Sequence, residues 1–150
     1  MTVTLVSVPD PFPVPIGLRL NQAARAIGRA FDETLAEAGG SLPVWLILLN
    51  LKIRRPGTQR ELAEAVGIRQ PTLSHHLDGM ERDGLILRAR TPDNRRVQTV
   101  TVTESGEALF LRLRRAAGAF DGRLRAGLDD AEVAELRRLL AQLAENAPPD

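Results

Sequence analysis

The stretch Thr58–Leu77 reads TQRELAEAVGIRQPTLSHHL and predicts two short helices joined by a tight turn. Thr58 and Glu61 have the spacing of a capping box, in which a hydroxyl and a carboxylate each accept a hydrogen bond from a backbone N–H group of the first turn. Gly67 then ends the first helix, and the second begins at about Gln70.

The second helix, expected from Gln70 to Asp83, is amphipathic and is followed by Gly84. Its apolar residues recur at steps of four and three, which turns them to one side of a helix. These inward residues are Leu73, Leu77 and Met80. The opposite side carries Gln70, Pro71, Ser74, His75 and Asp78.

The chain then becomes strand-like. Residues 85–90 and 97–103 are rich in residues that favour strands, and residues 91–96, TPDNRR, are typical of a basic hairpin tip. Helices followed by a hairpin over residues 43–102 have the element order of a winged helix-turn-helix. The predicted fold class is therefore mainly α, formally α+β.

Apolar stripes on both sides of this centre predict flanking helices. Residues 17–40 carry one such stripe. A buried helix is expected after it, with Ser41 as its N-cap and Pro43 just inside its start. A long helix is expected from Thr103 to about Arg125, and a last one from Asp129. A single wing domain is too small to bury these stripes, so they imply a partner, most simply a second copy of the chain.

Composition excludes several classes of protein. The 150 residues include no cysteine and two adjacent histidines, which excludes cysteine-based sites and disfavours a metal centre. We expect no catalytic residues, no cofactor and no enzyme activity, since no nucleophile constellation or phosphate loop is visible. No long apolar segment or signal peptide is evident, so we expect a cytoplasmic protein without a membrane partner. Residues 1–16 are a proline-rich arm, either extended or poorly ordered.

The near-neutral net charge conceals an uneven distribution. Between Lys52 and Val100 there are ten Lys or Arg residues against six Asp or Glu, so the flanks are acidic overall. A basic centre on a helix-turn-helix with a basic hairpin favours binding to duplex DNA.

Several short motifs, in this order and spacing, closely resemble the MarR (multiple antibiotic resistance regulator) family over roughly Gly17 to Ala147. They are LPVW (42–45), TQRELA (58–63), QPTLSHHL (70–77), MERDGLI (80–86), DNRR (93–96) and VTVTESG (100–106). The resemblance implies a homodimeric winged helix-turn-helix regulator of transcription that binds a pseudo-palindromic operator. It divides the chain into the arm (1–16), a helical dimerisation region (17–40 and 104–147) and a DNA-binding domain (41–103).

The outward side of the second helix supplies the predicted DNA contacts, because the first residues of a recognition helix reach base edges in the major groove. Gln70 can pair with adenine, and Ser74 and His75 can bond base edges or phosphate. Thr72 is expected at phosphate. The full set on this helix is Arg69, Gln70, Pro71, Thr72, Ser74 and His75.

At the hairpin, the resemblance places Arg95 in the minor groove, with Asp93 holding its orientation. A narrow A·T-rich minor groove attracts arginine through its negative potential. Arg96 is expected at phosphate. Arg88 and Arg90 alternate with apolar residues and share one strand face, which serves either for phosphate contact or only for solubility.

A small aromatic or anionic effector is expected to make the regulator, most simply a repressor, responsive to ligand. Trp45, Arg25 and Arg29 are the candidate pocket residues, and the alternatives are a core role for Trp45 and surface ion pairing of Arg29 with Asp32 or Glu33. The competing hypothesis for the whole chain is a winged-helix module that binds proteins and has lost DNA binding.

Overall fold

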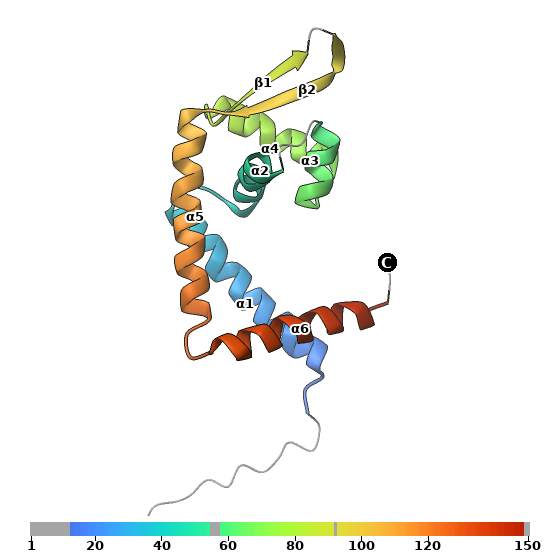
Figure 1. Cartoon of the computed structure of the whole chain (residues 1–150), viewed down its shortest axis with the longest axis vertical. Coiled ribbons are helices and arrows are strands. Elements are labelled where there is room, and N and C mark those ends of the chain that lie inside the picture. The colour runs from blue at the N-terminus through green and yellow to red at the C-terminus, as the bar shows by residue number, and fades with distance from the viewer. Residues whose placement is uncertain (1–12, 55–57, 92, 149–150) are drawn as a thin grey trace, which may run out of the picture.

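The computed structural model describes residues 13–54, 58–91 and 93–148, and these form six helices and one two-stranded sheet (Figure 1). In chain order the elements are α1 (Ile16–Glu37), α2 (Leu42–Ile53), α3 (Gln59–Val66), α4 (Gln70–Arg82), β1 (Ile86–Thr91), β2 (Asn94–Val102), α5 (Glu104–Leu124) and α6 (Asp130–Asn146). This mainly helical architecture confirms the predicted fold class. Most of the proline-rich arm lies outside the described residues, as do the side chains of residues 91 and 94–97.

Local capping signals place the helix starts as predicted. The Ser41 hydroxyl accepts a hydrogen bond from the Val44 amide at 3.4 Å, and α2 begins beside it. Thr58 forms the expected capping box with Glu61 at the start of α3. Asp129 does the same at the start of α6. Each cap satisfies backbone N–H groups that have no partner within the helix.

Helix α2 forms the centre of the core, because α3, α4, α5 and β2 all pack against it. Its side chains Ile47 and Leu48 are fully buried, and Trp45 stacks on Phe110 of α5 with ring centroids 5.5 Å apart. Helix α4 contributes the three inward residues that its periodicity predicts, Leu73, Leu77 and Met80. The core therefore fixes which side of α4 is left for solvent.

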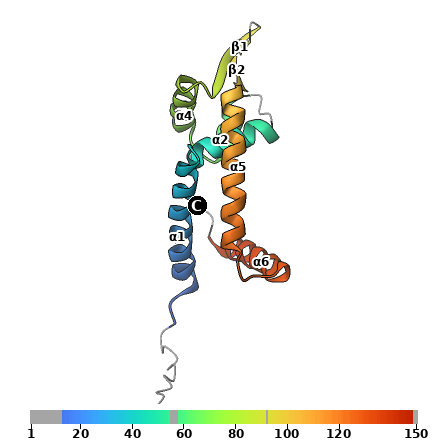
Figure 2. The same cartoon turned by 90° about the vertical axis from the view of Figure 1, so that its left-hand side faces the viewer.

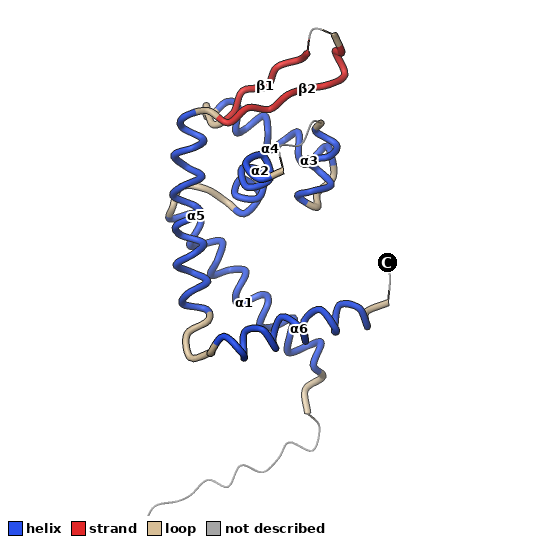
Figure 3. Tube along the Cα trace, in the orientation of Figure 1, coloured by secondary structure: helices blue, strands red, loops and turns tan. Residues whose placement is uncertain are grey.

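The two antiparallel strands β1 and β2 form a hairpin, here called the wing (residues 86–102), that extends from the helical body (Figure 3). The pairing runs from Ile86 with Val102 to Thr91 with Asn94. Strand β2 thus begins at Asn94, three residues earlier than the predicted start at residue 97. The tip predicted over residues 91–96 is shorter than expected, because Thr91 pairs with Asn94 beyond a break in register after Arg90.

The long helices at the two ends of the chain leave much apolar surface uncovered. Helices α1 and α5 pack on each other, with the rings of Phe31 and Phe120 5.1 Å apart. Helix α6 turns away from α5, and the two views together show it lying apart from α1 (Figure 2). Its residues Leu136, Leu139 and Leu140 are 40–46% exposed in the single chain.

Among the described residues, no single helix is long and apolar enough to cross a membrane. Helices α1 and α2 reach that length and composition only when taken together, and a bend of 74° separates them.

Candidate nucleic-acid interface

Helix α4 presents a polar face that no other element of the described chain covers. Gln70, Pro71, Thr72 and His75 are exposed, and Ser74 is half-buried. This is the side opposite the buried Leu73 and Leu77, as the spacing predicts. His76 is half-buried, in agreement with a packing role rather than an outward one.

The turn before α4 sets the direction of this face. Gly67 ends α3 with φ of 79°, a left-handed conformation that glycine adopts without a steric penalty. Arg69 is the N-cap residue of α4, is exposed and does not cap the helix through its side chain, and Pro71 lies in the first turn. The first turn of α4 therefore offers its side chains and a positive helix end to an anionic surface.

The wing lies beside α4 and carries the second group of predicted contacts. Arg90, near the end of β1, and Asp93, in the turn, are both exposed. Arg95 and Arg96 belong to β2, and their side chains lie outside what the structure describes. The roles assigned to Arg95 and Arg96 therefore stay predictions.

Arg88 departs from its sequence-based prediction. Its side chain is only 16% exposed, and its guanidinium forms ion pairs with Asp78 and Glu81 of α4. Arg88 shares a strand face with Ile86, which is fully buried, and that face meets α4 at the base of the wing. Arg90 lies farther out on the same face, where the wing has left the body. The two arginines thus have different surroundings despite their common direction.

This geometry brings in residues that the sequence analysis did not assign to the site. Glu81 accepts hydrogen bonds from the Arg88 guanidinium, and these bonds hold the pKa of the Glu81 carboxyl below its usual range. The same bonds raise the pKa of Arg88. On the other edge of the wing, the Gln59 amide of α3 donates to Gln98 of β2. For the contact between Glu81 and Arg88, the only local signal in the sequence is the three-residue step from Asp78 to Glu81, which puts both acids on one helix face.

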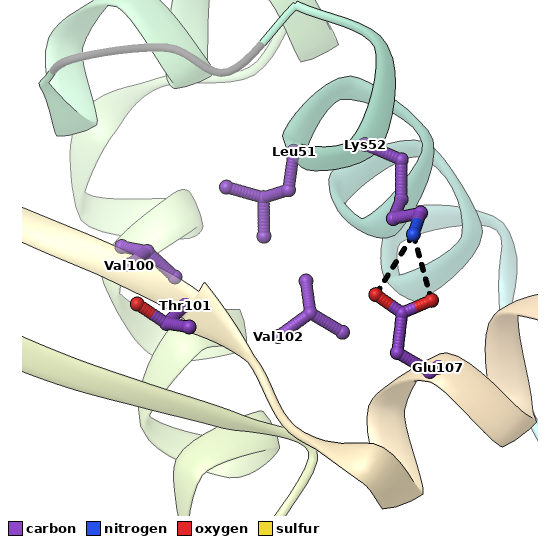
Figure 4. Close-up of a pocket in the computed structure, with 6 residues that line it drawn as sticks. All are labelled: Leu51, Lys52, Val100, Thr101, Val102 and Glu107. Carbon is purple, nitrogen blue, oxygen red and sulfur yellow. Dashed lines mark hydrogen bonds and ion pairs between the residues drawn. The ribbon is translucent and has the colours of Figure 1, made fainter.

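A pocket of about 240 Å³ lies behind the wing, between α2, β2 and α5 (Figure 4). Leu51, Val100 and Val102 form its apolar side. Lys52 and Glu107 close its edge through an ion pair, with both carboxylate oxygens 2.8 Å from Nζ. The ion pair joins the end of α2 to the start of α5. Because its two charges neutralise each other, the described lining of the pocket presents no free charge to a ligand.

The structure separates the three residues predicted for an effector pocket. Trp45 is a core residue, 9% exposed and stacked on Phe110. Arg25 and Arg29 are exposed on α1, and within the described part of the chain Arg29 forms no ion pair with Asp32 or Glu33. The core alternative for Trp45 is thus confirmed, and the alternative ion pairing of Arg29 is not formed in the single chain. An effector site at these residues stays a prediction.

Comparison with known proteins agrees with this geometry. The model of the family described as MarR matches residues 41–97. The crystal structure of the transcriptional regulator PA3341 is 32% identical in sequence, with a TM-score of 0.70, over 88% of this chain and 97% of that chain. The chain belongs to the MarR family. Members of this family are in general DNA-binding transcriptional regulators and not enzymes.

Two further MarR-like structures extend the comparison. The transcriptional repressor CouR, bound to a 23-mer DNA duplex, is 28% identical over 87% of this chain and 92% of that chain, with a TM-score of 0.77. A MarR-family transcriptional regulator from Rhodococcus sp. RHA1 is 25% identical over 86% of this chain and 91% of that chain, with a TM-score of 0.71. This MarR-family chain therefore has the winged-helix fold of a transcription regulator.

Proposed function

We propose that two copies of this chain form a dimer that binds a specific duplex DNA operator and represses transcription. The observation that carries the proposal is the uncovered polar face of α4 beside a projecting wing. An α-helix fits the major groove, and a hairpin at its side can reach the neighbouring minor groove.

In this proposal the residues of α4 divide between bases and phosphates. Gln70, Ser74 and His75 read base edges, because their amide, hydroxyl and imidazole groups can donate and accept hydrogen bonds. Arg69 and Thr72 contact phosphate at the start of the helix, and the exposed Pro71 packs against the groove.

At the wing, Arg95 enters the minor groove with Asp93 beside it, and Arg90 and Arg96 contact phosphate. Arg88 is not among the proposed contacts, because its guanidinium is engaged by Asp78 and Glu81. These assignments locate the DNA-binding domain in residues 41–103.

The dimerisation region comprises residues 17–40 and 104–147. Its support is the number of large apolar side chains that the single chain leaves exposed on α1, α6 and the turn between α5 and α6. The most exposed on α1 are Ile16 and Leu18, at 66% and 51%, and the turn adds Leu128 at 44%. Apolar areas of this kind on paired helices are typical of a two-fold interface. The dimer would place two copies of α4 on one side of the duplex.

Repression and ligand response are the finer parts of the proposal. Repression is supported by the likeness to CouR, which is described as a repressor on DNA. A small aromatic or anionic ligand that prefers one dimer geometry would change the spacing of the two α4 helices and so change operator affinity. Because its operator would be genomic DNA, we place the regulator in the cytoplasm.

A gel-shift assay at low salt with mixed-sequence duplex DNA, combined with light scattering, tests this function. The proposal expects a dimer mass and a shifted duplex whose affinity falls steeply with salt, since several phosphates are neutralised. A winged-helix module that binds only proteins would leave the duplex unshifted. A monomeric mass or an unshifted duplex would contradict the proposal.

A further inference from the structure

Arg88 of β1 is held by α4 through both its side chain and its backbone. Its Nε and Nη2 atoms donate to Glu81 Oε2 at 3.0 and 2.7 Å. Nη2 also donates to Asp78 Oδ1 at 2.5 Å. The Arg88 backbone N–H donates to Glu81 Oε1 at 3.2 Å. The Glu81 carboxylate therefore binds the strand itself as well as the guanidinium.

This arrangement is more buried than the other arginine ion pairs that join helices or strands in the described chain. Arg60–Glu64 and Arg138–Glu135 join residues of one helix, and all four of these side chains are more than half exposed. Arg125 pairs with Asp121 and Asp130 across the turn between α5 and α6, but at 3.4–3.6 Å and with its side chain 40% exposed. Exposed pairs of that kind contribute little because water competes for both charges. The Arg88 side chain is 16% exposed and connects two elements through charge-assisted hydrogen bonds, which are the stronger kind.

The wing depends on such attachments for its direction. A two-stranded hairpin has little stability of its own, so contacts at its base determine how it projects. On the β1 edge the base is held by Arg88 against α4. On the β2 edge, Gln98 accepts a hydrogen bond from Gln59 at the start of α3. The two helices of the helix-turn-helix thus each hold one strand of the wing.

We propose that Arg88 is a positioning residue for DNA binding, which fixes the wing against α4 through Glu81 and Asp78 and does not itself contact DNA. This inference rests on the proposed function, because the relative placement of α4 and the wing matters only if both engage one duplex. A hairpin free to swing would have to be ordered on binding, and ordering it lowers affinity.

Positioning and direct contact predict changes of opposite sign for Glu81→Gln. If Arg88 contacts phosphate, Glu81 competes with DNA for the guanidinium, and removing its charge strengthens binding. If Arg88 positions the wing, the same substitution loosens the wing and weakens binding. The matched control is Glu64→Gln on α3, which removes the same charge from an exposed ion pair that connects no second element.

The slope of affinity against salt gives a second discriminator. A lost phosphate contact lowers the slope of log K against log salt concentration by about one. Arg88→Gln should weaken binding without lowering this slope if Arg88 does not contact DNA. Arg88→Lys keeps the charge but loses the planar fork, so it should also weaken binding.

The experiment titrates each protein into a fluorescent duplex recovered by selection from a random library, and measures binding by fluorescence anisotropy. The thermal stability of each variant is measured first, so that weaker binding is not mistaken for unfolding. We expect Glu81→Gln and Arg88→Gln each to weaken binding by about three- to thirtyfold relative to Glu64→Gln, and the double variant to be no weaker than the weaker single variant. If Arg88→Gln does not fold, Glu81→Gln and Arg88→Lys carry the same comparison.

Three outcomes would overturn the inference. Glu81→Gln that binds as tightly as Glu64→Gln, or more tightly, contradicts the positioning role. A reduced salt slope in Arg88→Gln assigns the residue to phosphate instead. Wild-type binding is measured before any variant is made. A wild-type chain that binds no duplex would contradict the proposed function, and this inference with it.

Discussion

The hydroxyl of Thr103 donates a hydrogen bond to the carbonyl oxygen of Gly84 at 2.5 Å, so the long helix α5 begins against the residues where α4 ends. The Thr103 backbone N–H also donates to the Leu85 carbonyl at 3.0 Å, and its hydroxyl accepts from the Gly106 amide at 3.1 Å. These bonds connect the start of α5 to the end of α4 and to the base of the wing. In the proposed dimer this junction connects the subunit interface to the DNA-binding surface.

Gly106 allows this close junction, and Gly106→Ala should destabilise the fold. A Cβ atom there would overlap the Leu85 carbonyl oxygen and lie 2.7 Å from Cγ1 of Val102. Forcing an extra carbon into such a contact costs about 1–3 kcal/mol, although alanine is the better helix former. Urea unfolding measures the change, with the exposed neighbour Ser105→Ala as control. Equal stability of Gly106→Ala and the wild type would show that the junction can open.

The pair formed by Glu81 and Arg88 should make part of the stability depend on pH. Because Arg88 lowers the pKa of Glu81 from its ordinary value of 4.5, the stabilisation is present above that value and is lost as the pH falls through the lowered pKa. Asp78 also faces Arg88 and moderates the effect. Thermal unfolding of wild type and Glu81→Gln should therefore differ at neutral pH and converge in acid. A difference that stays constant down to about pH 3 would contradict the pairing.

The apolar face of α6 should be required for dimerisation. Leu136→Glu places a charge among Leu139 and Leu140, which are 44% and 40% exposed in the single chain. Burying an unpaired carboxylate is costly, so sedimentation analysis should show monomers at concentrations where the wild type is dimeric. Ala134→Glu adds the same charge on the opposite, exposed side of α6 and should leave the dimer intact. Equal dissociation by both variants would place the interface elsewhere.

The wing arginine should contribute strongly to operator affinity. Arg95→Ala is expected to weaken binding by about tenfold to a hundredfold, because a narrow minor groove concentrates negative potential at the bound guanidinium. Arg138→Ala, on the exposed surface of α6 far from the wing, is the control. Anisotropy titrations at physiological salt measure both. An Arg95 variant that binds as the Arg138 variant does would refute the assignment of the wing to the minor groove.

The parts of the fold set by neighbouring residues could be predicted from sequence. The caps at Ser41, Thr58 and Asp129 and the inward face of α4 follow from spacings of three and four residues. A strand period of two also correctly placed Arg88 and Arg90 on one face. It could not show that this face passes from the body into solvent between those two residues, since that depends on where α4 packs.

Contacts between distant residues gave no signal in the sequence. The bond between Gln59 and Gln98 joins positions 39 residues apart, and both glutamines are unremarkable in their own segments. The start of β2 at Asn94 was hidden because residues 91–96 are turn-forming, although Thr91 and Asn94 pair across the hairpin. These features arise from tertiary packing, which local propensity does not specify.

The most direct test of the central claim is selection of bound sequences from a random duplex library by the wild-type chain. A dimer with two α4 helices in successive major grooves predicts an enriched inverted repeat whose half-site centres are about 34–36 Å apart, one helical turn. Recovery of such a repeat would support both the dimer and the polar face of α4 as its reading surface. A library that shows no enrichment, with no duplex retained even in dilute buffer, would contradict the account.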